Sequence, residues 1–255
     1  MDYYNIPEFD ATGLVTTVYT SEGRGCWLSN NPEGWENYRE VLAHFGLGEE
    51  NITATFQRHS DSVQIVTRKE ARRHVFYRPD PMVIADGIIT AEPGLMISSM
   101  ESDCTPVYLL DPVRKVIGMI HSGWKGTASL ISVRAVQLME KEFSCRAEDI
   151  MVAFGPCICR DCYEVGEDII PPFAENFSEE EIHSFFIPKD NGKYLLDVNK
   201  AISISLMKEG VKEANIYSCG QCTYHGGKFY SHRRQLKAGL SGKDNMFTGI
   251  MLNIS

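Results

Sequence analysis

Three side chains able to bind soft or borderline metals lie in the first half of the chain: His59, Cys104 and His121. Each follows an apolar run that predicts a β-strand, so all three are expected at strand ends, where functional residues tend to lie. Two histidines and a cysteine that leave one position open form the ligand set of a catalytic zinc ion, and copper can use the same set. No short spacing links the three, and individually such side chains are more often buried, hydrogen-bonded structural residues.

Cys104 and His121 also allow chemistry without a metal. The cysteine could act as a thiolate nucleophile and the histidine as its base, as in a cysteine hydrolase or deamidase. Glu101 and Asp103 lie three and one residues before Cys104. Successive residues of an extended segment point to opposite sides, so the two acids are not both expected to face the site with Cys104. Neither acid is assigned as the proton carrier.

Five further cysteines form a second group. They are Cys157, Cys159, Cys162, Cys219 and Cys222. A tight run of three with a distant Cys-x-x-Cys could hold a structural zinc ion or an iron–sulfur cluster. However, Cys-x-Cys-x-x-Cys is unusual for zinc, and the preceding Gly-Pro indicates a constrained loop. Free thiols in a loop are therefore the default interpretation.

Basic residues at two places could bind an anion. Lys125 lies in the turn Gly123–Gly126, which leads into a predicted helix, and a helix N-terminus with glycines and a lysine is a typical anion site. The spacing of a Walker loop is absent. Arg233 and Arg234 form a second basic cluster, and arginine offers a bidentate fork to phosphate oxygens. A solvated charge run is the usual explanation for such a cluster.

Composition limits the class of partner. The chain has 255 residues, 43% of them hydrophobic, a net charge of -9 and a pI near 5.3. An acidic chain argues against a nucleic-acid or anionic-membrane surface, so a small molecule is the expected partner. The sequence shows no signal peptide and no stretch near the roughly 20 apolar residues of a membrane helix, so we expect a cytoplasmic protein with reduced cysteines.

Hydrophobic periodicity predicts several short strands before the first long core helix. Helices are predicted over Pro32–Leu47, Thr127–Phe143 and Asp197–Glu209. Strands are predicted at Leu14–Thr20, Asn51–Gln57, Val63–Thr67, Met82–Thr90, Gly94–Met100, Val107–Leu110, Val116–Ile120, Ile150–Phe154, Ile216–Tyr217, Phe229–Tyr230 and Met246–Leu252, with loops at 21–34 and 69–81. Strands and helices do not alternate strictly, which favours an α+β fold over a doubly wound one. No linker divides the chain, so a single domain over 1–255 is expected.

Motifs in a fixed order run from Gln57 to Arg234. They are Gln57-Arg58-His59, Ala85-Asp86, Asp103-Cys104-Thr105-Pro106-Val107, His121-Ser122-Gly123-Trp124-Lys125-Gly126, Gly155-Pro156-Cys157-Ile158, Tyr163-Glu164-Val165, Leu196-Asp197, Cys222-Thr223 and Ser231-His232-Arg233-Arg234. Together they resemble the bacterial laccase-domain family, also called the multicopper polyphenol oxidoreductase or purine nucleoside phosphorylase family. One departure is His232, where the family commonly has Tyr.

The resemblance implies a site, a fold and several activities. It implies zinc, with copper as an alternative, at His59, Cys104 and His121, within a layered α/β/β/α domain with mixed sheets. It also implies phosphorolysis of adenosine, inosine and methylthioadenosine, deamination of adenosine, and copper-dependent oxidation of phenols. Relatives further suggest an amidase that acts on cell-wall precursors.

These activities place different demands on the chain. Deamination suits a zinc ion with an open position, which can activate water for attack on C6 of adenine. Phosphorolysis needs a phosphate site, for which Lys125, Arg233 and Arg234 are the obvious suppliers. A conventional laccase has a mononuclear copper and a trinuclear cluster served by several His-x-His pairs, whereas this chain has seven histidines and no such pair. Phenol oxidation is therefore ranked second to nucleoside turnover.

Overall fold

Two mixed β-sheets stack against each other in the computed structural model, which describes residues 2–21, 32–71, 84–240 and 244–254. The larger sheet has the strand order β13-β9-β7-β8-β5-β4. Its strands are β4 (Val63–Ile65), β5 (Gly87–Thr90), β7 (Thr105–Asp111), β8 (Val116–Ser122), β9 (Met151–Phe154) and β13 (Ile216–Ser218). The outer pairs β13–β9 and β4–β5 are parallel, and the inner pairs are antiparallel.

The second sheet has the order β1-β2-β14-β6-β3. Its strands are β1 (Tyr3–Tyr4), β2 (Val15–Thr20), β3 (Ile52–Ala54), β6 (Met96–Glu101) and β14 (Met246–Leu252). Only β3 and β6 pair in parallel in this sheet, as far as the described residues go. Strands from both ends of the chain thus meet at its centre, where β14 lies between β2 and β6.

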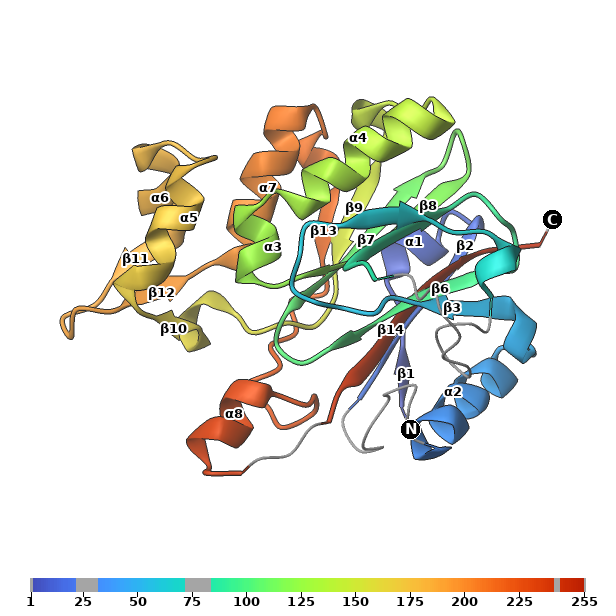
Figure 1. Ribbon diagram of the computed structural model, residues 1–255, viewed down its shortest axis with the longest axis horizontal. Coiled ribbons are helices and arrows are strands. Elements are labelled where there is room, and N and C mark those ends of the chain that lie inside the picture. The colour runs from blue at the N-terminus through green and yellow to red at the C-terminus, as the bar shows by residue number, and fades with distance from the viewer. Residues whose placement is uncertain (1, 22–31, 72–83, 241–243, 255) are drawn as a thin grey trace.

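Helices cover the outer faces of both sheets (Figure 1). The longer ones are α2 (Pro32–His44), α4 (Ile131–Phe143) and α7 (Val198–Glu209), and the shorter ones are α1 (Pro7–Asp10), α3 (Trp124–Ala128), α5 (Ile170–Ala174), α6 (Glu179–Phe185) and α8 (His232–Lys237). Helices α3, α4 and α7 pack on the larger sheet and α2 on the smaller one. The α/β/β/α layering and the α+β class expected from the sequence are confirmed.

A small third sheet extends from one end of the molecule, beneath α5 and α6 (Figure 1). It has the order β10-β12-β11, with β10 (Glu164–Val165), β11 (Phe186–Pro188) and β12 (Tyr194–Leu196). The sequence did not predict this unit. Its strands are only two or three residues long, too short for alternation to be visible.

The central strand β7 shows why the layers hold together. Val107 and Leu109 pack against the helices, whereas Tyr108 and Leu110 face the other sheet. Successive side chains of a strand point to opposite faces, so a strand buried on both faces is apolar throughout. The hydroxyl of the fully buried Tyr108 donates to the carbonyl of Val18, 2.9 Å away in β2, and ties the sheets together.

Several predicted boundaries were wrong. The helix predicted over Thr127–Phe143 is two helices, because Leu130 adopts a left-handed conformation (φ 60°) between α3 and α4. The strand predicted at Phe229–Tyr230 is a bend, whose residues are apolar because they are buried against the inter-sheet core. The predicted loops at 21–34 and 69–81, and the start of the strand predicted from Met82, lie largely outside the described residues.

None of the helices in the described ranges is both long and apolar enough to span a membrane.

Candidate metal centre and active site

The structure brings His59, Cys104 and His121 together. One ligand atom from each lies within 4.8 Å of the others, and the two imidazole centroids are 4.9 Å apart. His121 is near the end of β8, Cys104 lies between β6 and β7, and His59 lies in the loop after β3. The three ligands therefore gather where strand ends of the two stacked sheets meet.

The buried carboxylate of Asp86 orients both histidines. It accepts hydrogen bonds from the main-chain N–H groups of Arg58, His59 and Ser60 at 2.8–3.2 Å, and from the Ser60 hydroxyl. These bonds hold His59 in a left-handed conformation (φ 56°). Asp86 also contacts Nδ1 of His121 at 2.9 Å, which leaves Nε2 of His121 as the atom able to bind a metal.

The surroundings of His121 favour a positive charge. Burial lowers the pKa of His121, but Glu101, Cys104 and Asp86 outweigh burial and raise it well above its usual value. Burial raises the pKa of Asp86, but hydrogen bonds from His121 and Ser60 reverse this and hold it below its ordinary range. Such a site stabilises either a protonated imidazole or a bound cation.

Glu101 adds a second buried carboxyl group. It is fully buried, and burial raises its pKa to about 7 against the lowering effect of His121 and Ser99. Its Oε2 lies 3.8 Å from Nε2 of His121 and has no hydrogen-bond partner among the described residues. An orphaned acidic oxygen beside two imidazoles and a thiol is a fitting environment for a divalent cation.

Gly123 allows the ligands to approach one another. A Cβ atom at this position would lie 3.0 Å from Sγ of Cys104 and 3.2 Å from Cδ2 of His59. A side chain at Gly123 would therefore displace two of the three ligands. This gives the glycine that opens the turn before α3 a specific packing role.

A pocket of about 200 Å³ opens beside the ligands. His59 and Cys104 line it, whereas His121 is buried behind them. Aromatic, apolar and basic side chains also line it: Trp124, Ile158, Tyr163, Val198, His232 and Arg233. The ligand set is thus open on its pocket side, and the pocket combines flat apolar surfaces with a cationic group.

The three residues predicted to bind an anion are placed differently. Arg233 lines the pocket, donates to the Glu164 carbonyl at 2.6 Å and lies 5.1 Å above the Tyr163 ring. Lys125 is not among the lining residues, and its ammonium lies 5.6 Å from the Trp124 ring centroid.

The guanidinium of Arg234 forms hydrogen bonds with main-chain carbonyls. It donates to the carbonyls of Thr223, Tyr224 and Phe229 at 2.6–3.1 Å. The structure therefore gives Arg234 a role in holding the loop before α8, and it does not bring Arg234 into the pocket with Arg233.

The two acids that precede Cys104 both lie close to the site, on different sides of it. Glu101 is buried beside His121, whereas Asp103 lines the pocket. The expectation from alternation does not hold for Asp103, because β6 ends at Glu101 and Asp103 adopts a left-handed conformation (φ 79°). Asp103 accepts hydrogen bonds from the Thr223 hydroxyl at 2.5 Å and from the Arg233 main-chain N–H at 2.7 Å.

The second cysteine group separates into two kinds. Cys157 is buried, which raises its pKa to about 12, and it contacts the Asn199 amide. Cys219 is also apart, with its thiol near Tyr19. The other three gather around an imidazole that the sequence analysis did not single out: Cys159, Cys162, Cys222 and His225 have one ligand atom each within 4.8 Å of one another. The spacing Cys222-x-x-His225 was the signal that could have identified it.

Other functional residues were overlooked for a physical reason. Asp86, Tyr163 and His232 were noted only as parts of motifs, and their roles depend on contacts with residues far away in the sequence. Asp86 acts across 35 positions on His121, and Tyr163 and His232 reach the pocket from separate segments. Local spacing carries no trace of such contacts.

A pocket beside an incomplete set of metal ligands is typical of a metal-dependent enzyme that acts on small molecules. The family model described as "Multi-copper polyphenol oxidoreductase laccase" matches residues 12–253. The chain belongs to this family, as its motifs indicated.

Two relatives in different organisms are both named purine nucleoside phosphorylases. The human "Purine nucleoside phosphorylase LACC1" is 32% identical over 204 residues, which are 78% of this chain and 44% of that protein. The "Purine nucleoside phosphorylase" of Borreliella burgdorferi is 32% identical over 68% of this chain and 75% of its own length. This chain therefore spans less than half of the human relative and most of the bacterial one.

Solved structures share the fold. The Bacillus licheniformis hypothetical protein YfiH superimposes with a TM-score of 0.86 over 98% of this chain and 96% of its own, at 24% identity. YlmD from Geobacillus stearothermophilus gives a TM-score of 0.83 over 94% of this chain and 92% of its own, also at 24% identity. The layered α+β architecture is thus common to these proteins.

Proposed function

We propose that this protein is a zinc-dependent purine nucleoside phosphorylase whose metal is held by His59, Cys104 and His121. The proposal depends chiefly on one observation: the pocket that exposes His59 and Cys104 is also lined by the guanidinium-bearing side chain of Arg233. The names of the relatives supply the reaction class. Adenosine, inosine and methylthioadenosine are the proposed nucleosides.

The pocket's side chains suit a nucleoside and phosphate. Trp124 and Tyr163 offer aromatic faces on which a purine can stack, and Ile158 and Val198 add apolar surface. In phosphorolysis a phosphate oxygen bonds to C1′ of the ribose as the C1′–N9 bond breaks, and the purine leaves with a proton. Arg233 is proposed to bind and orient the phosphate, with Lys125 as a second candidate.

The chain's own groups prepare the metal site. Asp86 fixes the tautomer of His121 and the loop that carries His59, and Gly123 gives Cys104 its space. A zinc ion bound there would supply a Lewis acid facing the pocket. Hydrolytic deamination of adenosine is proposed as a second reaction of the same site.

Turnover of nucleosides with and without phosphate tests the proposal. Adenosine with phosphate is expected to give adenine and ribose 1-phosphate, whereas adenosine without phosphate is expected to give inosine. Arg233→Ala should raise the KM for phosphate at least about tenfold, since a charge-assisted bidentate contact contributes roughly 1.5–3 kcal/mol. If Arg233→Ala and Lys125→Ala both leave the phosphate dependence unchanged, the anion assignment is wrong.

Copper provides the second arm of the test. The family's description names a polyphenol oxidoreductase, and a His₂Cys set can hold one copper ion. Protein reconstituted with copper and assayed on phenols shows whether oxidation rivals nucleoside turnover. If no nucleoside is turned over, the amidase hypothesis is favoured instead. Peptide-like cell-wall precursors are then the substrates to screen.

A further inference from the structure

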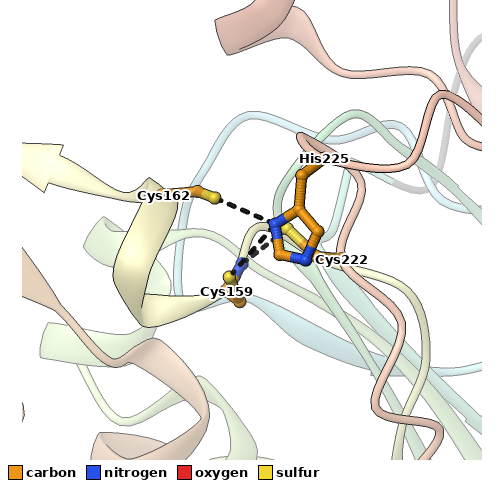
Figure 2. A group of neighbouring side chains, drawn as sticks. All are labelled: Cys159, Cys162, Cys222 and His225. Carbon is orange, nitrogen blue, oxygen red and sulfur yellow. Dashed lines mark hydrogen bonds between the residues drawn. The ribbon is translucent and has the colours of Figure 1, made fainter.

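A second cluster of metal-binding side chains lies outside the pocket. Cys159, Cys162, Cys222 and His225 converge from two chain segments that are about sixty residues apart (Figure 2). Nδ1 of His225 is 3.1 Å from Sγ of Cys162 and 3.9 Å from Sγ of Cys159. The three cysteines are partly buried and the histidine is exposed, and none of the four lines the described pocket.

Each segment supplies two ligands at the same spacing. Cys159 caps a single 3-10 turn that ends at Cys162, and its carbonyl accepts from the Cys162 main-chain N–H at 3.0 Å. This turn brings both thiols to one side. In the other segment Cys222 and His225 are also three positions apart, and Gly226 and Gly227 follow with φ of 99° and 67°. The two glycines let the chain reverse immediately after His225.

The ligand number and spacing are those of a closed zinc site. Two pairs of the form Cys-x-x-Cys and Cys-x-x-His make a Cys₃His set, which leaves no position for substrate. Zn–S bonds of about 2.3 Å and Zn–N bonds of about 2.0–2.1 Å in a tetrahedron place sulfur and nitrogen ligands about 3.6 Å apart. The observed 3.1 and 3.9 Å separations bracket this value. We propose that Cys159, Cys162, Cys222 and His225 bind a structural zinc ion.

The main chain supports this assignment. The N–H group of Cys159 donates to Sγ of Cys222 at 3.4 Å, a contact that stabilises a thiolate ligand. Residues Cys157 and Cys222 form a parallel bridge, in which the Thr223 N–H donates to the Cys157 carbonyl at 3.0 Å. The two ligand-bearing segments are thus already aligned side by side.

The proposed zinc ion joins two walls of the pocket. Tyr163 directly follows Cys162, and the loop after His225 leads to α8, which carries His232 and Arg233 at its start. Arg234, also in α8, donates to the carbonyls of Thr223 and Tyr224, which lie between the ligands Cys222 and His225. Cross-linking residues 159–162 to 222–225 therefore fixes the segments from which Tyr163 and Arg233 enter the pocket.

Metal content of the full-length protein, purified with zinc and without chelators, tests the proposal. Two zinc ions per chain are expected in the wild type, and one each in Cys162→Ser and His225→Ala. Cys219→Ser, which changes a thiol of the same loop outside the cluster, should keep both. His121→Ala should keep the cluster's ion, so this readout separates the proposed structural site from the proposed function.

Cobalt gives a signature that does not depend on the folding of a cluster variant. Co²⁺ added to apo His121→Ala protein should give tetrahedral d–d bands and a sulfur-to-cobalt charge-transfer band as strong as three thiolates require. Three results would overturn the assignment: no metal bound to His121→Ala, full zinc content in soluble Cys162→Ser, or a Cys159–Cys162 disulfide in freshly purified protein. Iron with acid-labile sulfide at these cysteines would overturn the assignment as well, because the site would then hold an iron–sulfur cluster.

Discussion

The two clusters of cysteine and histidine differ in the number of ligands they offer and in what surrounds them. His59, Cys104 and His121 leave a position open toward a pocket, and buried carboxyl groups lie behind them. The cluster of Cys159, Cys162, Cys222 and His225 has four ligands and no share in the described pocket lining. An incomplete set beside a cavity suits chemistry, whereas a complete set between two loops suits cross-linking.

The clusters also differ in how their ligands are positioned. The three-ligand site depends on Asp86, whose carboxylate binds the loop of His59 and the ring of His121. In the four-ligand cluster, tight turns within each segment bring the ligands together. We therefore expect the first site to be sensitive to changes in its supporting side chains and the second to depend mainly on its ligands.

Removing a ligand of the open site should have the largest effect. His121→Ala is expected to lower nucleoside turnover about 10³-fold or more, because a catalytic metal supplies several kcal/mol of transition-state stabilisation. Steady-state phosphorolysis, normalised to folded protein, measures this loss. Cys219→Ser serves as the control and should retain activity. If His121→Ala turns over nucleosides as fast as the wild type, the three-ligand site is not catalytic.

Removing a ligand of the closed cluster should affect stability first. Cys162→Ser is expected to cost roughly 3–4 kcal/mol of unfolding free energy at zinc concentrations 100 to 1,000 times the dissociation constant, which lowers Tm by roughly 5–15 °C. Calorimetry with excess zinc and with chelator measures the shift. A Tm that matches the wild type under both conditions would contradict a stabilising metal.

A change in the support of the open site should be smaller and confined to that site. Asp86→Asn keeps the shape but replaces one acceptor oxygen by an NH₂ group, which cannot accept from the Ser60 N–H or its hydroxyl. We expect metal affinity or turnover to fall about 10–100-fold, as is typical for partners of metal-binding histidines. Metal titration followed by activity assays measures this loss.

Asp161→Asn, next to the cluster ligand Cys162, is the matched control for Asp86→Asn. Asp161 pairs with Arg160 at the surface, so its replacement should change neither metal site. Equal losses in the two variants would show that the sites do not differ in their dependence on supporting carboxylates.

Crowding the open site should have the smallest effect. Gly123→Ala places a methyl group 3.0 Å from Sγ of Cys104, at an expected cost of about 1 kcal/mol and roughly fivefold in metal affinity. Gly118→Ala in β8 meets only the Leu109 side chain, at 3.2 Å, among the atoms nearest to it, and controls for general crowding. If both variants bind metal equally well, Gly123 has no special role at the ligands.

Much of the fold could be predicted from local pattern. The strand Met246–Leu252 has the bounds that were predicted, and the predicted helix from Asp197 is α7 with Asp197 as its N-cap, which accepts from the Lys200 N–H at 3.0 Å. The predictions failed where tertiary contacts outweigh local preference. Leu130 interrupts a continuous helical pattern, and Phe229 is apolar because it fills the core between the sheets.

The sequence by itself predicted the layered fold, the family and the candidate ligand set of His59, Cys104 and His121, because strand-end motifs in a fixed order carry that information. Tertiary structure decided which basic side chain enters the pocket: Arg233 lines it, whereas Arg234 binds main-chain carbonyls. It also decided that His225 joins three of the cysteines, while Cys157 and Cys219 stay apart. The cluster forms because segments some sixty residues apart fold onto each other, and the spacing within either segment does not encode that approach.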